Sequence, residues 1–145
     1  MANAVYLHVA RSYGLYPSTP AEQRRVDMLL FDCGDLRDVL FQLVYWYKKV
    51  CRTKEEFAKQ KVSYFPTRAA PFFDKYEAFL AQADTPFFVG DSPLACDFVL
   101  WEMVDVHRLL AVDLDSPDPT EGRPALGRWY DRFKELEGMV GYLGS

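Results

Sequence analysis

The chain has 145 residues, of which half are hydrophobic and 16% are aromatic, and its formal net charge is −4. This composition excludes a disordered chain and predicts one packed domain. The sequence has no basic stripe that would neutralise phosphates, so no nucleic-acid partner is expected. It also has no apolar run of about 18 to 20 residues that would span a bilayer, so no membrane partner is expected.

The three cysteines indicate a reducing compartment. Cys33, Cys51 and Cys96 are odd in number and far apart, and they lie in segments that read as helical. The N-terminus has no basic region followed by an apolar one, so nothing suggests secretion. We therefore expect reduced thiols in a cytoplasmic protein.

Two capping motifs mark the first long helices. Thr19-Pro20-Ala21-Glu22 combines an N-cap hydroxyl, a proline at the first helical position and a glutamate that caps reciprocally. Apolar residues spaced three or four apart then run from Val26 to Val50, through Tyr47, and predict a helix over residues 20–50 with Gly34 as a bend. Thr53 to Glu56 repeats the capping box, so the next helix should pack back as an antiparallel hairpin.

The rest of the chain also predicts helices. Pro66 and Pro71 should break or kink the helix that Thr53 starts, and an amphipathic stretch covers residues 72–80. The segment 94–110 has few polar positions and should be buried nearly all round. A loop over 113–122, a helix from Pro124 and a short helical turn over 139–143 complete the pattern. The sequence predicts an all-α bundle around one buried hydrophobic helix.

Motifs for nucleophilic or metal chemistry are absent from the sequence. No phosphate-binding loop, zinc-binding helix or nucleophile elbow occurs. His8 and His107 are the only histidines, and we expect both to be structural or solvated, with His107 near a helix end. The acidic loop from Asp113 to Glu121 lacks the spacing of a calcium loop, so no metal site is expected.

The long helix carries the most informative polar residues. Asp35 and Arg37 interrupt its apolar pattern, and Tyr45 follows Asp35 by ten residues. Because about 3.6 residues make one turn, Asp35 and Tyr45 project in similar directions and could flank one cleft. The alternative is that Asp35 and Arg37 are ordinary surface charges and Tyr45 is a packing aromatic.

Several short motifs at consistent spacing resemble the mu and pi classes of glutathione transferase. Asp35-Leu36-Arg37 and Tyr45 match a family pattern in which the tyrosine faces the electrophile. Further matching segments are Arg25-Val26-Asp27, Phe57 to Lys61, Phe87 to Asp91, and Asp97-Phe98. Asn3 to Tyr16 resembles the helix that closes the family's thioredoxin-like domain.

The resemblance implies a division of the chain into two parts. Residues 1–16 correspond to the terminal helix of a thioredoxin-like domain that is otherwise absent, and residues 17–145 to the C-terminal helical domain. The family's thiol-activating residue lies in the absent domain, so no catalytic residue is expected in this chain. Glutathione is implied as co-substrate, and no cofactor is expected.

The resemblance also assigns roles by position. Asp35 would reach the α-amino group of glutathione bound to the neighbouring subunit, and Tyr45 would line the electrophile pocket. Arg11 and Asp27 would pair across a two-fold axis, and Arg37 is assigned to the same dimer interface. Another interface arginine of the family falls on Leu7, so a weak homodimer is expected.

Ser92 and Asp97 are assigned structural roles at the start of the buried helix. The family has Ser or Thr three residues before the aspartate, where this chain has Leu94. Ser92 followed by Pro93 would supply a cap two residues earlier, which would leave Asp97 inside the first turns.

The sequence thus predicts the helical domain of a glutathione transferase, which supplies an electrophile-binding wall and a dimer surface and is inactive without the thioredoxin-like half. The alternative is a non-catalytic interaction module of the same fold, which would need neither Asp35 nor Tyr45. A third possibility is a protein that only binds hydrophobic ligands.

Overall fold

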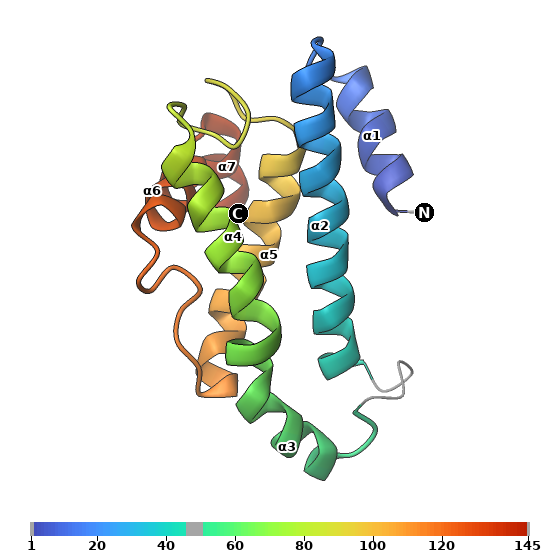
Figure 1. The fold of residues 1–145 in the computed structure, drawn as a ribbon, viewed down its shortest axis with the longest axis vertical. Coiled ribbons are helices and arrows are strands. Elements are labelled where there is room, and N and C mark those ends of the chain that lie inside the picture. The colour runs from blue at the N-terminus through green and yellow to red at the C-terminus, as the bar shows by residue number, and fades with distance from the viewer. Residues whose placement is uncertain (1, 46–50, 145) are drawn as a thin grey trace.

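The computed structural model describes residues 2–45 and 51–144, and these ranges contain helices and no strand (Figure 1). Seven are α-helices and one is a π-helical turn. Their bounds are α1 Ala2–Ser12, α2 Pro20–Val44, α3 Lys54–Tyr64, η2 Phe65–Ala69, α4 Ala70–Gln82, α5 Ala95–Leu114, α6 Pro124–Lys134 and α7 Glu137–Leu143. The predicted all-α class is therefore confirmed.

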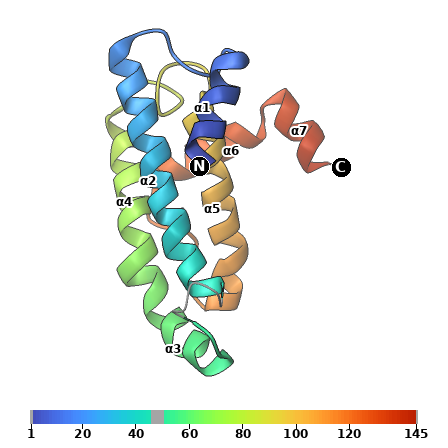
Figure 2. The same ribbon diagram turned by 90° about the vertical axis from the view of Figure 1, so that its right-hand side faces the viewer.

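The core lies where α2, α4, α5 and α6 meet. α2 packs along α5, α4 packs against α6, and α1 crosses both α2 and α5. Leu29, Phe73, Leu100 and Trp129 come from the four core helices, and each has at most 1% of its surface exposed. Figure 2 shows α1 over the upper part of α2 and α5, with the N-terminus at mid-height.

α2 starts as predicted and ends earlier than predicted. The Glu22 N–H donates to Thr19 Oγ1 at 3.4 Å. The Thr19 hydroxyl in turn donates to the Glu22 carboxylate at 2.5 Å, so the reciprocal bond is made by the side chain instead of the backbone. The helix ends at Val44, with Tyr45 in an extended conformation. Tyr47 and Val50, on which the prediction of a longer helix relied, lie outside the described residues.

The α3–α4 segment bends without breaking. The Thr53 capping box is present, since Glu56 N–H donates to Thr53 Oγ1 at 3.1 Å and Thr53 N–H donates to the Glu56 carboxylate at 3.2 Å. Pro66 lies in the π-helical turn η2, and Pro71 lies in the first turn of α4, where a missing N–H costs little. The predicted kink is realised as this π turn.

α5 is the central apolar helix, but one side of it is exposed. It begins at Ala95 and continues to Leu114, four residues beyond the predicted end. Phe98, Leu109 and Val112 are 38%, 70% and 86% exposed. The prediction of burial nearly all round is therefore wrong for this side of the helix. Asp115, in the left-handed conformation, ends the helix.

The prediction that His107 lies near a helix end is wrong. His107 lies within α5, in the core, with 1% of its surface exposed. Its Nε2 lies 2.7 Å from the Tyr64 hydroxyl, and its Nδ1 lies 2.7 Å from the Met103 carbonyl oxygen. Because the carbonyl only accepts, Nδ1 carries the proton and Nε2 accepts from Tyr64. Burial lowers the pKa of His107 to about 4, so the ring is neutral at pH 7.

A carboxylate from α4 caps the start of α6. The two oxygens of Glu77 accept from the N–H groups of Ala125 and Leu126, at 3.1 and 2.7 Å. Arg123, just before α6, also donates to Asp74 of α4 at 2.8 Å. The N-terminus of α6 thus depends on a neighbouring helix for its hydrogen-bond partners.

Within the described ranges, no helix has the length and apolar character needed to cross a membrane.

Candidate functional site

An apolar groove of about 460 Å³ lies between α2 and α5, and Tyr45, the C-cap residue of α2, is one of its lining residues. We call it the Tyr45 groove. Its lining is mostly aliphatic and aromatic, with one charged pair, and consists of Arg37, Leu40, Phe41, Val44, Tyr45, Glu102, Met103, Val106 and Leu110. Small-molecule sites are concave and mostly apolar, with a few polar groups that orient the ligand. The Tyr45 groove has this character.

Tyr45 is held at the groove by its place at the end of α2. Its backbone is extended, and its N–H donates to the Phe41 carbonyl at 2.9 Å. The Tyr45 ring meets the Phe41 ring edge to face, with centroids 4.9 Å apart. The side chain is 42% exposed, so a bound molecule has access to it.

Arg37 is engaged by α1 and α5 of its own chain. Its Nη1 donates to Tyr6 Oη at 2.6 Å, its Nη2 to the Glu102 carboxylate at 2.5 Å, and its Nε lies 3.5 Å from Met103 Sδ. Burial disfavours the charge, but the Tyr6 bond and the charge of Glu102 outweigh it and raise the pKa of Arg37. Arg37 is therefore a charged link between three helices.

Asp35 does not line the Tyr45 groove. It lies exposed on α2, on a different side from the groove. The extrapolation that brought Asp35 and Tyr45 to one cleft assumed a regular helix through Tyr45, whereas Tyr45 has left the helix. Within one chain, the cleft therefore brings together Tyr45 and Arg37 but not Asp35.

Arg11 and Asp27 are brought together by Tyr16. The Arg11 guanidinium lies 4.9 Å from the centre of the Tyr16 ring, and the Tyr16 hydroxyl donates to Asp27 Oδ1 at 2.8 Å. Burial, followed by the bond to Asp27, raises the pKa of Tyr16. Two of the predicted interface residues, Arg11 and Asp27, thus belong to one cluster on the α1–α2 side of the chain, whereas Arg37 contacts Tyr6 and Glu102 instead.

Asp97 organises the start of α5, and Ser92 does not cap it. Leu94 is the N-cap, so the predicted cap at Ser92 is two residues too early, and Asp97 is the third residue of the helix. Asp97 Oδ2 accepts the Leu94 N–H at 2.9 Å, and Oδ1 accepts from Phe88 N–H at 3.2 Å and Trp129 Nε1 at 2.9 Å. Burial still raises the pKa of Asp97. The Asp97 carboxylate thus links the start of α5 to α6 and to the loop before α5.

A second apolar groove lies on the other half of α5. This α1–α5 groove has a volume of about 440 Å³. Its lining residues come from α1, α5 and the turn between α1 and α2, and they are Val5, Tyr6, Val9, Ala10, Leu15, Ala95, Phe98, Val99 and Glu102. Glu102 lines both grooves.

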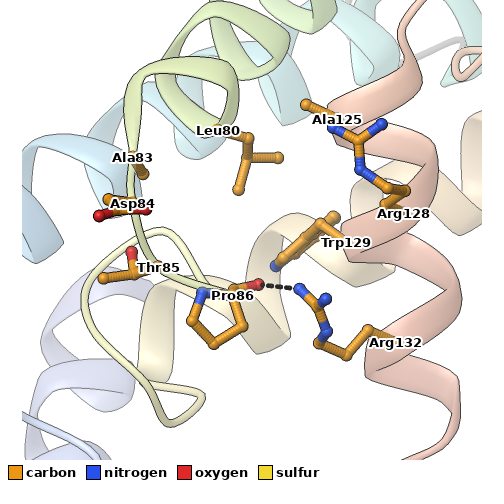
Figure 3. Close-up of a pocket in the computed structure, with 9 residues that line it drawn as sticks. All are labelled: Leu80, Ala83, Asp84, Thr85, Pro86, Ala125, Arg128, Trp129 and Arg132. Atoms are coloured by element: carbon orange, nitrogen blue, oxygen red, sulfur yellow. Dashed lines mark hydrogen bonds between the residues drawn. The ribbon is translucent and has the colours of Figure 1, made fainter.

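A polar cleft of about 360 Å³, which shares no lining residue with these grooves, lies between the end of α4 and α6 (Figure 3). Arg128 and Arg132 of α6 face the loop from Ala83 to Pro86 across it. Arg132 Nη1 donates to the Pro86 carbonyl at 3.1 Å, so the Arg132 side chain links α6 to this loop. None of the residues predicted as functional lies here.

Tyr6, Tyr16 and Glu102 were missed by sequence reasoning. Tyr6 bonds to Arg37 and Tyr16 bonds to Asp27. These partners are 31 and 11 residues apart in the chain, so no local pattern in the sequence predicts the contacts. Glu102 carried a usable signal, since it is a charged residue within the apolar run from Phe98 to Val104. A charge inside such a run indicates a position that faces solvent or a polar partner.

Comparison with known proteins identifies the class to which this helical bundle belongs. Residues 34–145 match the family described as "Glutathione S-transferase, C-terminal domain". The chain therefore belongs to the glutathione S-transferase family, and it matches the C-terminal domain of that family.

Individual relatives agree with this assignment. The chain is 27% identical to human glutathione S-transferase Mu 4 over 99% of its length, 30% identical to the rabbit Mu 1 enzyme, and 26% identical to a glutathione S-transferase P of Caenorhabditis elegans. These alignments cover 59%, 59% and 64% of the respective relatives. The chain thus spans about three fifths of the length of the curated relatives.

Solved structures share the fold. The glutathione S-transferase Blo t 8 aligns with a TM-score of 0.83 and 23% identity, over all of this chain and 62% of its own. A pi-class enzyme of Onchocerca volvulus aligns with a TM-score of 0.74 and 24% identity, over 99% of this chain and 64% of its own. The predicted fold, a glutathione-transferase C-terminal helical bundle, is confirmed.

Proposed function

We propose that the chain supplies the electrophile-binding wall of a glutathione transferase, with the Tyr45 groove as the binding site. The observation that carries this proposal is an apolar groove whose lining includes the partly exposed phenol of Tyr45. Hydrophobic electrophiles fit the lining, and the Tyr45 hydroxyl can donate a hydrogen bond to an oxygen on which negative charge develops. Conjugation of glutathione would then need a thioredoxin-like half to activate the thiol.

Ligand binding in the groove is tested with a neutral fluorescent probe. N-phenylnaphthylamine should bind the 145-residue chain, and Val44→Glu, which places a charge on the groove wall, should weaken binding about tenfold or more. Val112→Glu is the matched control, because Val112 is 86% exposed and does not line the groove. Equal binding by the two variants would show that the probe does not use the Tyr45 groove.

The division of labour is tested by conjugation of glutathione to a chlorinated aromatic substrate. The 145-residue chain should give no turnover above the uncatalysed rate. When it is joined genetically to the thioredoxin-like half of rabbit Mu 1, turnover should appear, and Tyr45→Phe should lower kcat about 10- to 100-fold. Turnover at ordinary enzyme rates by the chain alone would contradict the proposal.

We also propose that the chain forms a weak homodimer through the α1–α2 side. The cluster of Arg11, Tyr16 and Asp27 supports this proposal, because it holds opposite charges on one surface, as a self-complementary two-fold contact requires. Asp35 would then serve the glutathione of the partner subunit. Sedimentation should show a concentration-dependent dimer that Arg11→Glu weakens and that Arg11→Glu with Asp27→Arg restores.

A second candidate function is a non-catalytic interaction module. Its support is a set of exposed apolar side chains: Val5 on α1 and Tyr13 just after it, at 59% and 77%, and Val140 and Tyr142 on α7, at 58% and 71%. Affinity purification with mass spectrometry should then recover a stable partner, and Val5→Glu should release it while Tyr45→Phe should not. The free thiols of all three cysteines support the cytoplasm as the compartment for either function.

A further inference from the structure

One face of α5 lines both apolar grooves. Ala95, Phe98 and Val99 face the α1–α5 groove, and Met103, Val106 and Leu110 face the Tyr45 groove. Spacings of three and four residues along this series put all of them on one side of the helix. The two grooves are therefore consecutive parts of one apolar stripe.

Glu102 stands where the two parts meet. Among the α5 residues that line either groove, it is the charged one, and it lines both. Its carboxylate accepts from Arg37 Nη2 at 2.5 Å, and Arg37 Nη1 donates to Tyr6 Oη at 2.6 Å. Side chains from α1, α2 and α5 thus form a continuous polar bar across the stripe. Figure 2 shows α1 reaching mid-height over α2 and α5, with the lower halves of both helices beyond its N-terminus.

The bar is held firmly by its own contacts. All three nitrogens of the Arg37 guanidinium group are engaged, the third one with Met103 Sδ at 3.5 Å. The Arg37 side chain is only 18% exposed, so moving it aside would break several bonds at once. An apolar ligand that crossed the bar would also desolvate the Arg37–Glu102 pair without replacing its hydrogen bonds, which is costly.

We infer that Tyr6, Arg37 and Glu102 act as a gate that fixes the inner end of the Tyr45 groove and so limits the length of the apolar ligand. Arg37 is a specificity-determining residue in this inference. Short neutral aromatic ligands fit between Tyr45 and Arg37, whereas long neutral ligands are excluded unless the gate is removed. The inference rests on the proposed function of the Tyr45 groove as a binding site for hydrophobic molecules.

The test compares a short and a long neutral probe, N-phenylnaphthylamine and diphenylhexatriene, by fluorescence titration of the full chain. Arg37→Met keeps an unbranched side chain but removes the charge and the donors. It should raise the preference for diphenylhexatriene over N-phenylnaphthylamine, measured as the ratio of the two dissociation constants, about tenfold. Arg128→Met, a matched substitution in the polar cleft on α6, should change neither dissociation constant.

Glu102→Ala provides a second variant that does not disturb the core, since the Glu102 side chain is 57% exposed. It should also favour the long probe, by about threefold or more. Suppose that Val44→Glu weakens binding of the short probe, but neither Arg37→Met nor Glu102→Ala changes the ratio of the two dissociation constants. The gate is then refuted, and the proposed function stands. If the short probe is insensitive to Val44→Glu, the proposed function and the gate both fail.

Discussion

Replacing His107 should reduce the loss of folding stability that this chain undergoes in mild acid. The ring is neutral in the folded chain because it is buried beside Tyr64 and Phe73, and burial lowers its pKa to about 4. In the unfolded chain the pKa returns to about 6.5. The unfolded state therefore binds a proton that the folded state does not, and stability falls as the pH drops from about 6.5 to 4.

The size of this effect follows from the two pKa values. At about 1.36 kcal/mol for each pH unit, the difference between about 6.5 and about 4 corresponds to about 3 kcal/mol. All of this stability is present above pH 6.5 and is lost below pH 4. Asp97 contributes with the opposite sign, because burial raises its pKa and protonation relieves its buried charge.

The measurement is the free energy of unfolding in urea, followed by tryptophan fluorescence at pH 7.5 and 4.5. His107→Gln should be less stable than the wild type at pH 7.5, and its loss between the two pH values should be smaller by about 2 to 3 kcal/mol. His8→Gln is the matched control, because His8 is exposed on α1 and should leave the pH dependence unchanged. Equal pH dependence for wild type and His107→Gln would refute the reasoning.

Three further predictions follow from buried or capping contacts. Asp97→Ala should lower the free energy of unfolding by about 3 kcal/mol or more, because three N–H donors would lose their acceptor, and Asp97→Asn should cost less. Thr53→Ala should cost about 1 kcal/mol by removing the cap of α3, whereas Thr53→Ser should retain most of it in the same urea titration. The cysteines should react with a thiol reagent at pH 7 far more slowly in the folded chain than in urea. All three are buried, and burial raises the pKa of Cys33 to about 12. Fast labelling of the native chain would contradict this prediction.

The helices were predictable because their signals are local. Each capping threonine lies within three residues of its partner glutamate, and the apolar spacing of α2 can be read within one window. The end of α5 was not predictable in the same way. Val112 is apolar but 86% exposed, so its hydrophobicity did not indicate whether it is buried. The helix also continues through Asp113 and Leu114, which were predicted to lie in a loop.

The candidate site was only partly predictable. The sequence singled out Tyr45 and Arg37, and both line the Tyr45 groove, but the bonds that place Arg37 reach Tyr6 and Glu102, which are 31 and 65 residues away in the chain. The expected cap at Ser92 was wrong because Leu94 is the N-cap and its N–H bonds to Asp97 three residues on, whereas the bond from Trp129 of α6 to Asp97 spans 32 residues. Long-range hydrogen bonds leave no periodic signal in one sequence.

The Glu77 cap makes the folding of α6 conditional on that of α4. A helix that caps itself can form before its neighbours, but the start of α6 obtains its acceptors from a side chain 48 and 49 residues earlier in the chain. The amides of Ala125 and Leu126 are thus protected from exchange with solvent only while α4 is docked. In native-state hydrogen exchange, α4 and α6 should therefore open together as one cooperative unit, and Glu77→Ala should separate them.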